Sequence, residues 1–340
     1  MKINIDIYSK DPIYKQITDY VEKLVHDGQM PAGFQLPSMN ELASELKISK
    51  ETVKKAYGFL VERGIIDPKQ GKGFYVAERT NSRMQVLVIF DKFSVYKQRM
   101  FTAFSEELGP YAEITILNHN QSVELFEYYL NSNLDRFDWY VIAPHFPLDA
   151  ETQERAIRQL KRIPYRKLIM IDHLQPGISG QFGAVYQDFQ SDIHAGLLQG
   201  ISDENKIDHL RVITLPTSLY GDQIRKGVEF FAREQHIQVE FLKGIPTNIQ
   251  SGDTFLVLNS QLDAGLVGLA RQIEAKGLVI GRDVRIISYN EYDMNELVLG
   301  GLTTVSTDFP EMGRIAAQMI RSRQLSRIHC PFRMTRRKTF

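Results

Sequence analysis

Hydrophobic positions follow two different patterns along the chain. In the first 78 residues they recur at helical spacing, beginning with Ile13, Ile17, Tyr20, Val21, Leu24 and Val25. After a polar stretch at 78–83, short apolar runs typical of strands alternate with amphipathic helical stretches. We therefore predict an N-terminal domain at 1–78, a linker at 79–84 and a larger domain at 85–340.

Two further helices are predicted in the N-terminal domain. Ser38 is followed three residues later by Glu41, a capping-box pattern that predicts a helix over 39–46. After a short turn, Ser49 is placed to cap a third helix over 50–63, which Gly64 would end.

The third helix has one apolar face and one charged face. At about 100° per residue, the apolar face carries Val53, Ala56, Tyr57 and Leu60. The opposite face carries Lys50, Glu51, Lys54 and Lys55. Such a helix after a short turn is typical of a recognition helix, whose cations neutralise phosphates or read guanine edges in the major groove. The alternative is an ordinary solvated face stabilised by a Glu51–Lys55 pair.

A hairpin is predicted directly after this helix. Strand-like runs at 65–67 and 74–76 flank the glycine-rich turn Gly71-Lys72-Gly73. Glycine permits a tight turn, and Lys72 at its tip is placed to contact a phosphate. The turn does not fit a phosphate-binding P-loop, because the required spacing and the following helix are missing.

These motifs, in this order, resemble the winged helix-turn-helix of the GntR family. The resemblance covers nearly all of residues 8–78 and is carried by Pro12-Ile13-Tyr14-Lys15-Gln16-Ile17, Gly28, Pro31-Ala32-Gly33, Leu36-Pro37-Ser38, Glu41-Leu42-Ala43, Ser49 to Ala56, Gly64-Ile65-Ile66 and Gly71-Lys72-Gly73. It implies that Lys50, Thr52 and Lys54 meet DNA in the recognition helix and that Lys72 stands in the wing. The full predicted DNA-binding set is Ser38, Ser49, Lys50, Thr52, Lys54, Lys55, Gly71, Lys72 and Gly73.

The chain departs from the family at three positions near the DNA. Arginines are common in the family where this chain has Lys50 and Lys54, and another is common just before the helix-two glutamate, where this chain has Asn40. Lysine is a point charge, whereas arginine offers a bidentate fork. The operator sequence is therefore not implied by the resemblance.

The larger domain is predicted to have an α/β fold. Its strand-like runs are 86–90, 113–117, 139–143, 168–171, 210–215, 239–242, 254–258 and 284–288. Its helical stretches include 97–108, 150–162, 223–234 and 262–275. This alternation predicts two lobes, each a doubly wound parallel sheet covered on both faces, with ligand bound outside the carboxyl ends of the strands.

This domain resembles the LacI/GalR effector domain, which has the periplasmic-binding-protein fold. Four stretches carry the resemblance, namely 139–144 with 163–164 and 168–172, 257–265, 286–291, and 302–306 with 311–316. Asp172, Asn259 and Asn290 each follow an apolar strand, and the resemblance implies that they contact ligand. The family also often has an arginine three residues before the glycine of a second-lobe helix; counted from Gly227 this position is Ile224, and Arg225 follows it.

The predicted ligand is a neutral monosaccharide, because these positions offer an acid and amides without a cluster of cations. A deoxyhexose such as L-fucose, or a pentose, fits this chemistry. A phosphosugar, which would favour Arg or Lys, a purine and an amino acid are the alternatives. Aromatic rings that could stack on a sugar include Phe146, and the full predicted ligand-binding set is Phe93, Tyr96, His145, Asp172, Arg225, Asn259 and Asn290.

Composition narrows the class of protein. The chain has 340 residues, 43% of them hydrophobic, and its 41 Lys and Arg balance 41 Asp and Glu. Zero net charge excludes an overall basic protein but not a local basic face. The one cysteine, Cys330, excludes an intrachain disulfide and a cysteine-rich metal site, so we expect no metal and no cofactor. Without a signal-peptide core or a long apolar run, a cytoplasmic location without membrane contact is expected.

Together these patterns and resemblances predict a sugar-responsive DNA-binding transcription regulator, a repressor of carbohydrate catabolic genes that binds double-stranded operator DNA. The family resemblance and the geometry of operator half-sites imply that it acts as a homodimer. The alternative is an enzyme fused to a DNA-binding domain. Nucleophile-elbow, His-Glu-x-x-His and dinucleotide motifs are missing, and an aminotransferase-like domain would need a longer chain, so no catalytic residues are expected. The basic tail, Arg333, Arg336, Arg337 and Lys338, is interpreted as the solvated end of the last strand.

Overall fold

The computed structural model describes residues 5–6, 9, 11–77, 83–202, 206–214, 218–258 and 264–340. The chain forms two compact units, Met1–Met84 and Gln85–Phe340, and each is described by itself. Most of the predicted linker falls on residues 78–82, which lie outside the described residues.

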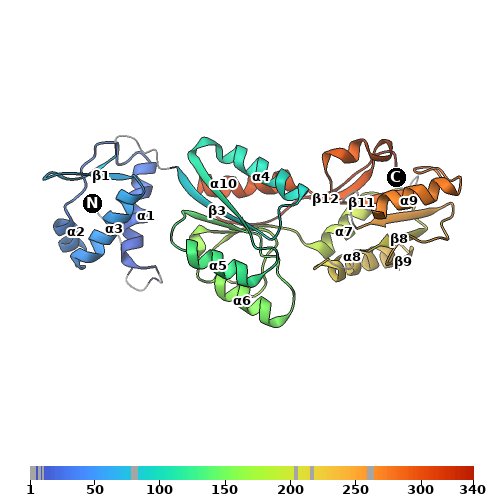
Figure 1. Ribbon diagram of the computed structural model, residues 1–340, viewed down its shortest axis with the longest axis horizontal. Helices are drawn as coiled ribbons and strands as arrows, with labels where there is room; N and C mark the ends of the chain where they lie inside the picture. The colour runs from blue at the N-terminus through green and yellow to red at the C-terminus, as the bar shows by residue number, and fades with distance from the viewer. Residues whose placement is uncertain are drawn as a thin grey trace. The chain divides into compact units, whose positions relative to one another are not determined.

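The first unit is a three-helix domain followed by a β-hairpin (Figure 1). Its elements are α1 Ile13–His26, α2 Met39–Leu46, α3 Lys50–Glu62, β1 Ile66–Lys69 and β2 Gly73–Val76. Lys47, in the left-handed conformation at φ 54°, ends α2, and the turn to α3 follows it. The helix boundaries predicted from spacing and capping agree closely with these bounds.

The core of this unit forms where the apolar faces of the helices meet. Ile17 and Val21 of α1 and Val53 and Leu60 of α3 are fully buried, and Leu42 of α2 joins them. The four residues predicted for the apolar face of α3 are all buried. The opposite face of α3 is therefore the one available to solvent.

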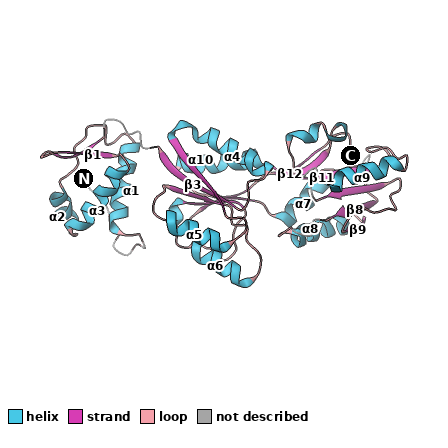
Figure 2. Ribbon diagram, viewed as in Figure 1, coloured by secondary structure: helices cyan, strands magenta, loops and turns pink. Residues whose placement is uncertain are grey.

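The second unit has two lobes, each with strands at its centre and helices on both sides (Figure 2). The sheet of the first lobe has the strand order β13-β7-β6-β5-β3-β4. Its strands are β3 Met84–Phe90, β4 Ala112–Asn118, β5 Trp139–Ile142, β6 Leu168–Asp172, β7 Gly183–Tyr186 and β13 Arg327–His329. Its helices are α4 Val95–Leu108, α5 Val123–Asn133, α6 Ala150–Leu160 and α10 Phe309–Ser322, with short 3₁₀ turns at Gly109–Tyr111 and Tyr165–Lys167. Helices α4 and α10 pack together on one face, and α5 and α6 lie on the other.

The sheet of the second lobe has the strand order β14-β12-β11-β10-β8-β9. Its strands are β8 His209–Ile213, β9 Gln238–Leu242, β10 Asp253–Val257, β11 Arg285–Tyr289, β12 Thr303–Thr307 and β14 Phe332–Thr335. Its helices are α7 Phe189–Leu198, α8 Gly221–Glu234 and α9 Ala264–Ala275, with 3₁₀ turns at Asp293–Glu296 and Val298–Gly300. Strand β14 runs antiparallel to β12, a departure from the all-parallel prediction, whereas β8 to β12 pair in parallel as predicted.

The described chain passes between the lobes at three places. Strand β7 of the first lobe leads into α7, strand β12 of the second leads back into α10, and β13 leads into β14. These crossings make the hinge between the lobes, so any group that ties the crossing strands to the ligand region can influence closure. Within the described residues, no helix has the length and apolar character needed to cross a membrane.

Candidate functional site

Helix α3 begins with a well-formed cap. The Ser49 hydroxyl accepts a hydrogen bond from the Thr52 backbone N–H at 3.2 Å, and the two side-chain oxygens lie 2.8 Å apart. These contacts satisfy part of the donor capacity that every helix start leaves open. Ser49 and Thr52 are thereby fixed at the end of the helix that is predicted to enter the groove.

The exposed face of α3 carries its lysines. Lys50, Lys54 and Lys55 are exposed. Lys54 lies 3.6 Å from Glu51, but both side chains are well exposed, so this pair restrains the lysine weakly. Lys55 lies 4.1 Å from the centre of the Tyr14 ring rather than beside Glu51, the partner that the sequence suggested. The face therefore presents exposed cations, of which Lys54 is only weakly restrained and Lys55 lies against an aromatic ring.

Ser38 belongs to the predicted DNA-binding set, and in the structure it caps the start of helix α2. Its hydroxyl accepts from the Glu41 backbone N–H, and the Glu41 carboxylate accepts from the Ser38 N–H at 2.8 Å. This reciprocal pair lowers the pKa of Glu41, first through the backbone N–H of Ser38 and then through its hydroxyl. The predicted capping box is therefore present at the start of α2.

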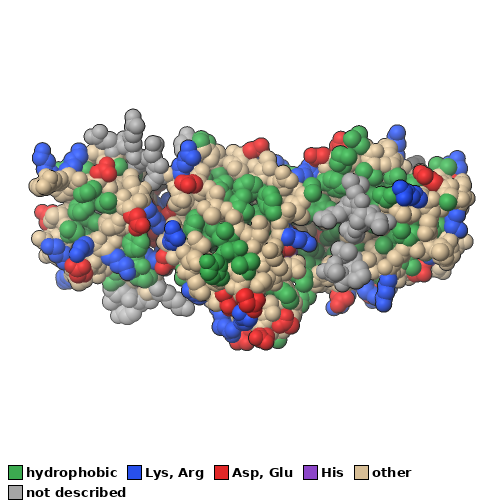
Figure 3. Space-filling model, in the orientation of Figure 1, with side chains coloured by type: hydrophobic (Ala, Val, Ile, Leu, Met, Phe, Trp, Pro, Cys, Tyr) green, Lys and Arg blue, Asp and Glu red, His purple; other side chains and the backbone are tan. Residues whose placement is uncertain are grey.

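The hairpin after α3 ends in a turn around Lys72. Gly71 and Gly73 both have positive φ, 72° and 98°, which explains why glycine flanks the lysine. Lys72 is exposed at this turn. Figure 3 shows Lys and Arg side chains at the hairpin end and over the α2–α3 side of the unit.

The second unit holds a cavity of about 700 Å³ lined by both lobes. Several of its residues directly follow or end a strand: Asp91 after β3, Asp172 at the end of β6, Gln187 after β7, Thr214 after β8, Leu258 after β10 and Asn290 after β11. The cavity therefore lies at the carboxyl ends of the parallel strands, where ligands bind in open α/β sheets.

A buried polar network forms part of the cavity wall. The Asp172 carboxylate accepts from His145 Nε2 at 2.8 Å and lies 3.1 Å from Lys97 Nζ, while its other oxygen accepts from Gln187 Nε2. Lys97 also forms an ion pair with Asp91. Both carboxylate oxygens of Asp172 are therefore engaged by protein groups.

Burial and charge act in opposite directions on Asp172. Burial alone would raise the pKa of its carboxyl, but the Lys97 ammonium and His145 outweigh burial and lower the pKa below its usual range. Burial lowers the pKa of His145, so its imidazole is neutral near pH 7. With the Nε2 hydrogen directed to Asp172, Nδ1 of His145 accepts from the Tyr220 hydroxyl at 2.9 Å.

Aromatic pairs from both lobes line the cavity. Tyr96 of α4 stacks on Phe309 of α10 with 5.6 Å between ring centroids. In the second lobe, Phe189 of α7 stacks on Tyr220 at 4.2 Å. Flat apolar rings beside polar groups suit a ligand with both apolar faces and hydroxyls.

The structure brings five of the seven predicted ligand residues to the cavity, namely Tyr96, His145, Asp172, Arg225 and Asn290. Asn259 lies outside the described residues. Phe93 does not line the cavity; it is 45% exposed and packs beside Phe90 and Phe101. Phe146 is fully buried in the first-lobe core and stacks on His119, so it is not available to a sugar ring.

Sequence reasoning missed three residues that hold the cavity together, Lys97, Gln187 and Tyr220. Lys97 lies in the first turn of α4, near Asp91 at the end of the preceding strand, and this strand-to-helix spacing was an available signal. Gln187 follows β7, a four-residue strand that the pattern did not reveal. Tyr220 precedes α8 and reaches the site only because the lobes meet there.

The charges of the described cavity residues cancel. The acids Asp91, Asp172 and Asp222 face the bases Lys92, Lys97 and Arg225. Lys97 pairs with the two buried carboxylates, and Arg225 pairs with Glu229 at 2.9 Å. Lys92 has no ion pair within the described part of the chain. In that part, no group of three or more His, Cys, Asp or Glu side chains is arranged to hold a metal ion.

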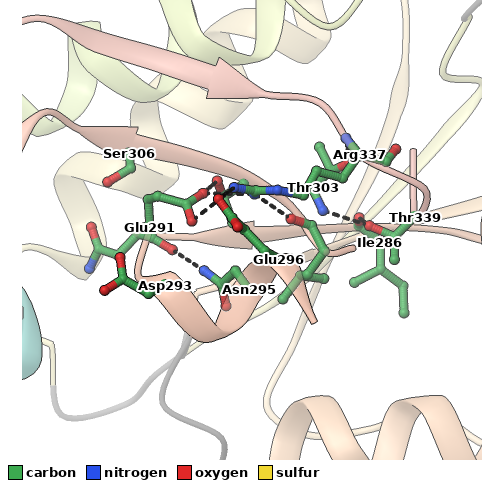
Figure 4. A network of polar contacts seen from close by, with 12 residues as sticks. Ile286, Glu291, Asp293, Asn295, Glu296, Thr303, Ser306, Arg337 and Thr339 are labelled. Atoms are coloured by element: carbon green, nitrogen blue, oxygen red, sulfur yellow. Dashed lines mark hydrogen bonds and ion pairs between the residues drawn. The ribbon is translucent and has the colours of Figure 1, made fainter. Parts of the chain in front are cut away.

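The basic tail is not simply a solvated strand end. Arg337 donates to Glu291 at 2.9 Å and to the Leu302 carbonyl, and its side chain is only 17% exposed (Figure 4). Thr339 accepts from the Thr303 N–H and donates to the Ile286 carbonyl at 2.8 Å. For Arg337 the sequence interpretation is therefore wrong, since this segment closes over the ends of β11 and β12.

Comparison with known proteins matches both units. A model of gntR-family bacterial regulatory proteins matches residues 13–76, and one of periplasmic-binding-protein-like domains matches residues 203–333. The repressor YtrA of Bacillus subtilis is 39% identical over 82 residues, 24% of this chain and 63% of that protein. The mannosyl-D-glycerate system repressor MngR of Escherichia coli is 37% identical over 82 residues, 24% of this chain and 34% of that protein.

A longer match is the regulator TreR of Bacillus subtilis, 29% identical over 229 residues, 63% of this chain and 86% of that protein. The chain thus spans less than two thirds of YtrA and about a third of MngR.

Solved structures share the fold of the larger unit. The periplasmic-binding-protein/LacI-type regulator of Alkaliphilus metalliredigens, solved with D-xylulofuranose, has a TM-score of 0.55 at 14% identity, covering 75% of this chain and 98% of that chain. A dimeric Lac repressor has a TM-score of 0.56 at 16% identity, with the same coverage. The chain therefore consists of a GntR-family helix-turn-helix domain joined to a periplasmic-binding-protein-like domain.

Proposed function

We propose that this protein is a sugar-responsive transcription regulator, a repressor that binds operator DNA through its N-terminal unit. The observation that carries the proposal is the exposed lysine face of α3, directly opposite the face that the core buries. A helix so placed can enter the major groove while its lysines neutralise phosphates. The GntR-family match over residues 13–76 and the repressors YtrA and MngR support this assignment.

The proposed effector is a neutral monosaccharide bound in the cavity between the lobes. The cancelling charges of the cavity residues and the stacked aromatic pairs support a neutral polyol with one apolar face. A deoxyhexose such as L-fucose or a pentose fits this chemistry, and the fold relative from Alkaliphilus metalliredigens was solved with a sugar. Tyr96, Asn290 and Arg225 are the proposed contacts, whereas both ring nitrogens of His145 are already hydrogen-bonded to Asp172 and Tyr220.

A phosphosugar is the second candidate effector, and one observation favours it. Lys92 lines the cavity without an ion pair in the described residues, so it could pair with a phosphate. A single unpaired lysine offers a phosphate fewer contacts than the bidentate or multiple contacts that phosphate sites usually have. We therefore rank the neutral sugar first.

Control of DNA binding is proposed to follow from lobe closure in a homodimer. A ligand that contacts both lobes favours the closed arrangement by its difference in affinity for the two states. Closure then changes the spacing of two winged helices relative to the half-sites of a palindromic operator. The expected coupling is on the order of 1–3 kcal/mol.

The test has a DNA arm and a ligand arm. Duplexes are selected by binding from a randomised pool, and gel shift then compares the wild type with Lys50→Ala and Lys54→Ala. Each variant should weaken binding and flatten its salt dependence by about one counterion, whereas Lys226→Ala on α8 should change neither. If the wild type binds no duplex even at low salt, the proposed DNA-binding function is wrong.

In the ligand arm, thermal shift is measured with a panel of L-fucose, pentoses, hexoses and their phosphates. A sugar that binds the folded state must raise the melting temperature. Stabilisation by phosphosugars alone would overturn the neutral-sugar assignment, and turnover of any bound sugar would show an enzymatic role.

A further inference from the structure

The tip of the β1–β2 hairpin would be mobile if it were held only by its own turn. Lys72 lies between Gly71 and Gly73, and glycine has more backbone freedom than other residues. The turn itself contributes the hydrogen bond from the Lys72 N–H to the Lys69 carbonyl at 2.9 Å. A flexible tip would lose conformational entropy whenever its lysine bound a phosphate.

Two side chains from outside the turn hold this tip. The Lys72 carbonyl accepts from Gln35 Nε2 at 3.0 Å and from the Tyr75 hydroxyl at 3.1 Å. Gln35 precedes α2 and is 37 residues away in sequence. The carbonyl oxygen has two lone pairs, and both are used by side chains anchored in the body of the unit.

The anchors are themselves fixed by main-chain pairing. Residues 33–36 run antiparallel to β2, with Gln35 bridged to Tyr75. Gly33 N–H donates to the Val76 carbonyl at 2.8 Å, and Leu36 N–H donates to the Phe74 carbonyl at 2.9 Å. The segment before α2 thus pairs with β2 through an isolated antiparallel bridge, and this pairing orients the Gln35 carboxamide.

Tyr75 contacts both lysines of the hairpin. Its hydroxyl donates to the Lys72 carbonyl, and its ring lies 4.8 Å from the Lys69 ammonium. A Cβ atom on Gly73 would lie 3.7 Å from Gln35 Nε2, so the carboxamide passes close against the turn. The backbone of Lys72 is held, while its side chain remains exposed.

We propose that Gln35 and Tyr75 are positioning residues for DNA binding: they clamp the Lys72 carbonyl so that the Lys72 ammonium is presented to a phosphate in a preorganised wing. This inference rests on the proposed DNA-binding function and adds residues that make no contact with DNA themselves. Their effect on affinity is transmitted through Lys72 alone.

The test is a double-mutant cycle in the full-length chain. Gln35→Met keeps a neutral side chain of similar length without a donor, and Tyr75→Phe removes only the hydroxyl. Binding to a mixed-sequence DNA duplex is measured by fluorescence anisotropy between about 50 and 200 mM salt, a range over which phosphate contacts change affinity strongly. Lys72→Ala defines the loss of the wing contact, and Tyr128→Phe, at an exposed position of α5, is the matched control.

Each clamp variant should weaken binding by about twofold to tenfold, the range for losing one preorganised side chain, and reduce the salt slope toward that of Lys72→Ala. In the Lys72→Ala background the same changes should have no further effect. Hydrogen exchange at the Lys72 amide should become faster in both clamp variants, while α1 to α3 stay protected.

The outcomes separate the two proposals. If the wild type does not bind the duplex, the proposed function fails. If the wild type binds but the clamp variants match it, or if they weaken binding equally with and without Lys72, the positioning role is overturned. Faster exchange at Lys72 with unchanged binding would likewise overturn it.

Discussion

His145 Nδ1 and the Tyr220 hydroxyl lie 2.9 Å apart and form a hydrogen bond that links the two lobes across the ligand cavity. On its other side, His145 donates to Asp172, and Asp172 accepts from Gln187 at the first crossing between lobes. Gln187 in turn accepts from Thr307 at 2.6 Å, where the second crossing begins. A continuous chain of hydrogen bonds therefore runs from the cavity to two hinge strands.

We predict that Tyr220→Phe removes the hydrogen bond to His145 and lowers the free energy of unfolding. The variant keeps the stacking on Phe189 but leaves Nδ1 of His145 buried without a donor, a loss of about 1–3 kcal/mol. Urea unfolding can be followed through Trp139, the one tryptophan of the chain, which lies in β5. Tyr128→Phe, at a 65% exposed position, is the control and should unfold like the wild type. Equal stability of the two variants would show that the Tyr220 hydroxyl does not support the fold.

Replacing Lys97 or Lys92 compares the stability contribution of a buried, ion-paired lysine with that of a lysine in the same cavity. Lys97→Met should lower the free energy of unfolding by about 3–5 kcal/mol, because it leaves two buried carboxylates without their cation. Lys92→Met, in the same cavity, should cost less than about 0.5 kcal/mol, because Lys92 holds no ion pair in the described residues. Urea titration at pH 7 gives both values. A small effect of Lys97→Met would mean that Asp91 and Asp172 find other partners or become protonated.

The helices of the N-terminal unit were predictable because their signals are local. Ser38 with Glu41 and Ser49 with Thr52 are caps within a few residues of sequence, and the buried face of α3 follows from its period alone. Most strands of the parallel sheets were predictable as apolar runs, because both faces of such sheets are covered. Strands β7 and β12 were not among the predicted runs.

The details of the cavity were less predictable because they depend on contacts distant in sequence. Gln187 meets Thr307 over 120 residues and Tyr220 meets His145 over 75, and no local pattern encodes such pairs. Phe93 and Phe146 share the residue type of true cavity aromatics, but the first is displaced onto the surface and the second into the core. Residue type and position after a strand were enough to select candidate cavity residues. Only tertiary packing decides which of these candidates line the cavity.

We predict that Ser38→Ala destabilises α2 by about 1 kcal/mol, because it removes the hydroxyl half of the capping box. Hydrogen exchange at the amides of α2 measures the opening free energy of this helix directly. Ser44→Ala is a matched control, since Ser44 is exposed inside the same helix and alanine favours helix there. If the two variants open equally, the cap does not stabilise α2.

Buried titratable groups predict how stability depends on pH. Burial lowers the pKa of His119 to about 4 and that of His173 to about 3. Burial lowers the pKa of His145 as well. Asp192 acts in the opposite direction, because burial raises the pKa of its carboxyl to about 6 despite His329 beside it. Acidification therefore removes stability through the histidines and returns part of it through Asp192.

His119 offers the cleanest test, since it is fully buried and its Nε2 lies 3.1 Å from the Ala143 carbonyl. Its unfolded form binds a proton below about pH 6.5 and its folded form only near pH 4, so its contribution is complete above 6.5 and is lost as pH falls toward 4. Between pH 7 and pH 5 this loss is about 2 kcal/mol. His119→Gln, which keeps a neutral donor, should reduce the pH dependence of urea unfolding by that amount. His236→Asn, at an exposed position with a left-handed φ of 57° that asparagine tolerates, is the matched control for replacing a histidine. An unaltered slope in His119→Gln would show that the buried ring is already protonated in the folded state at pH 5.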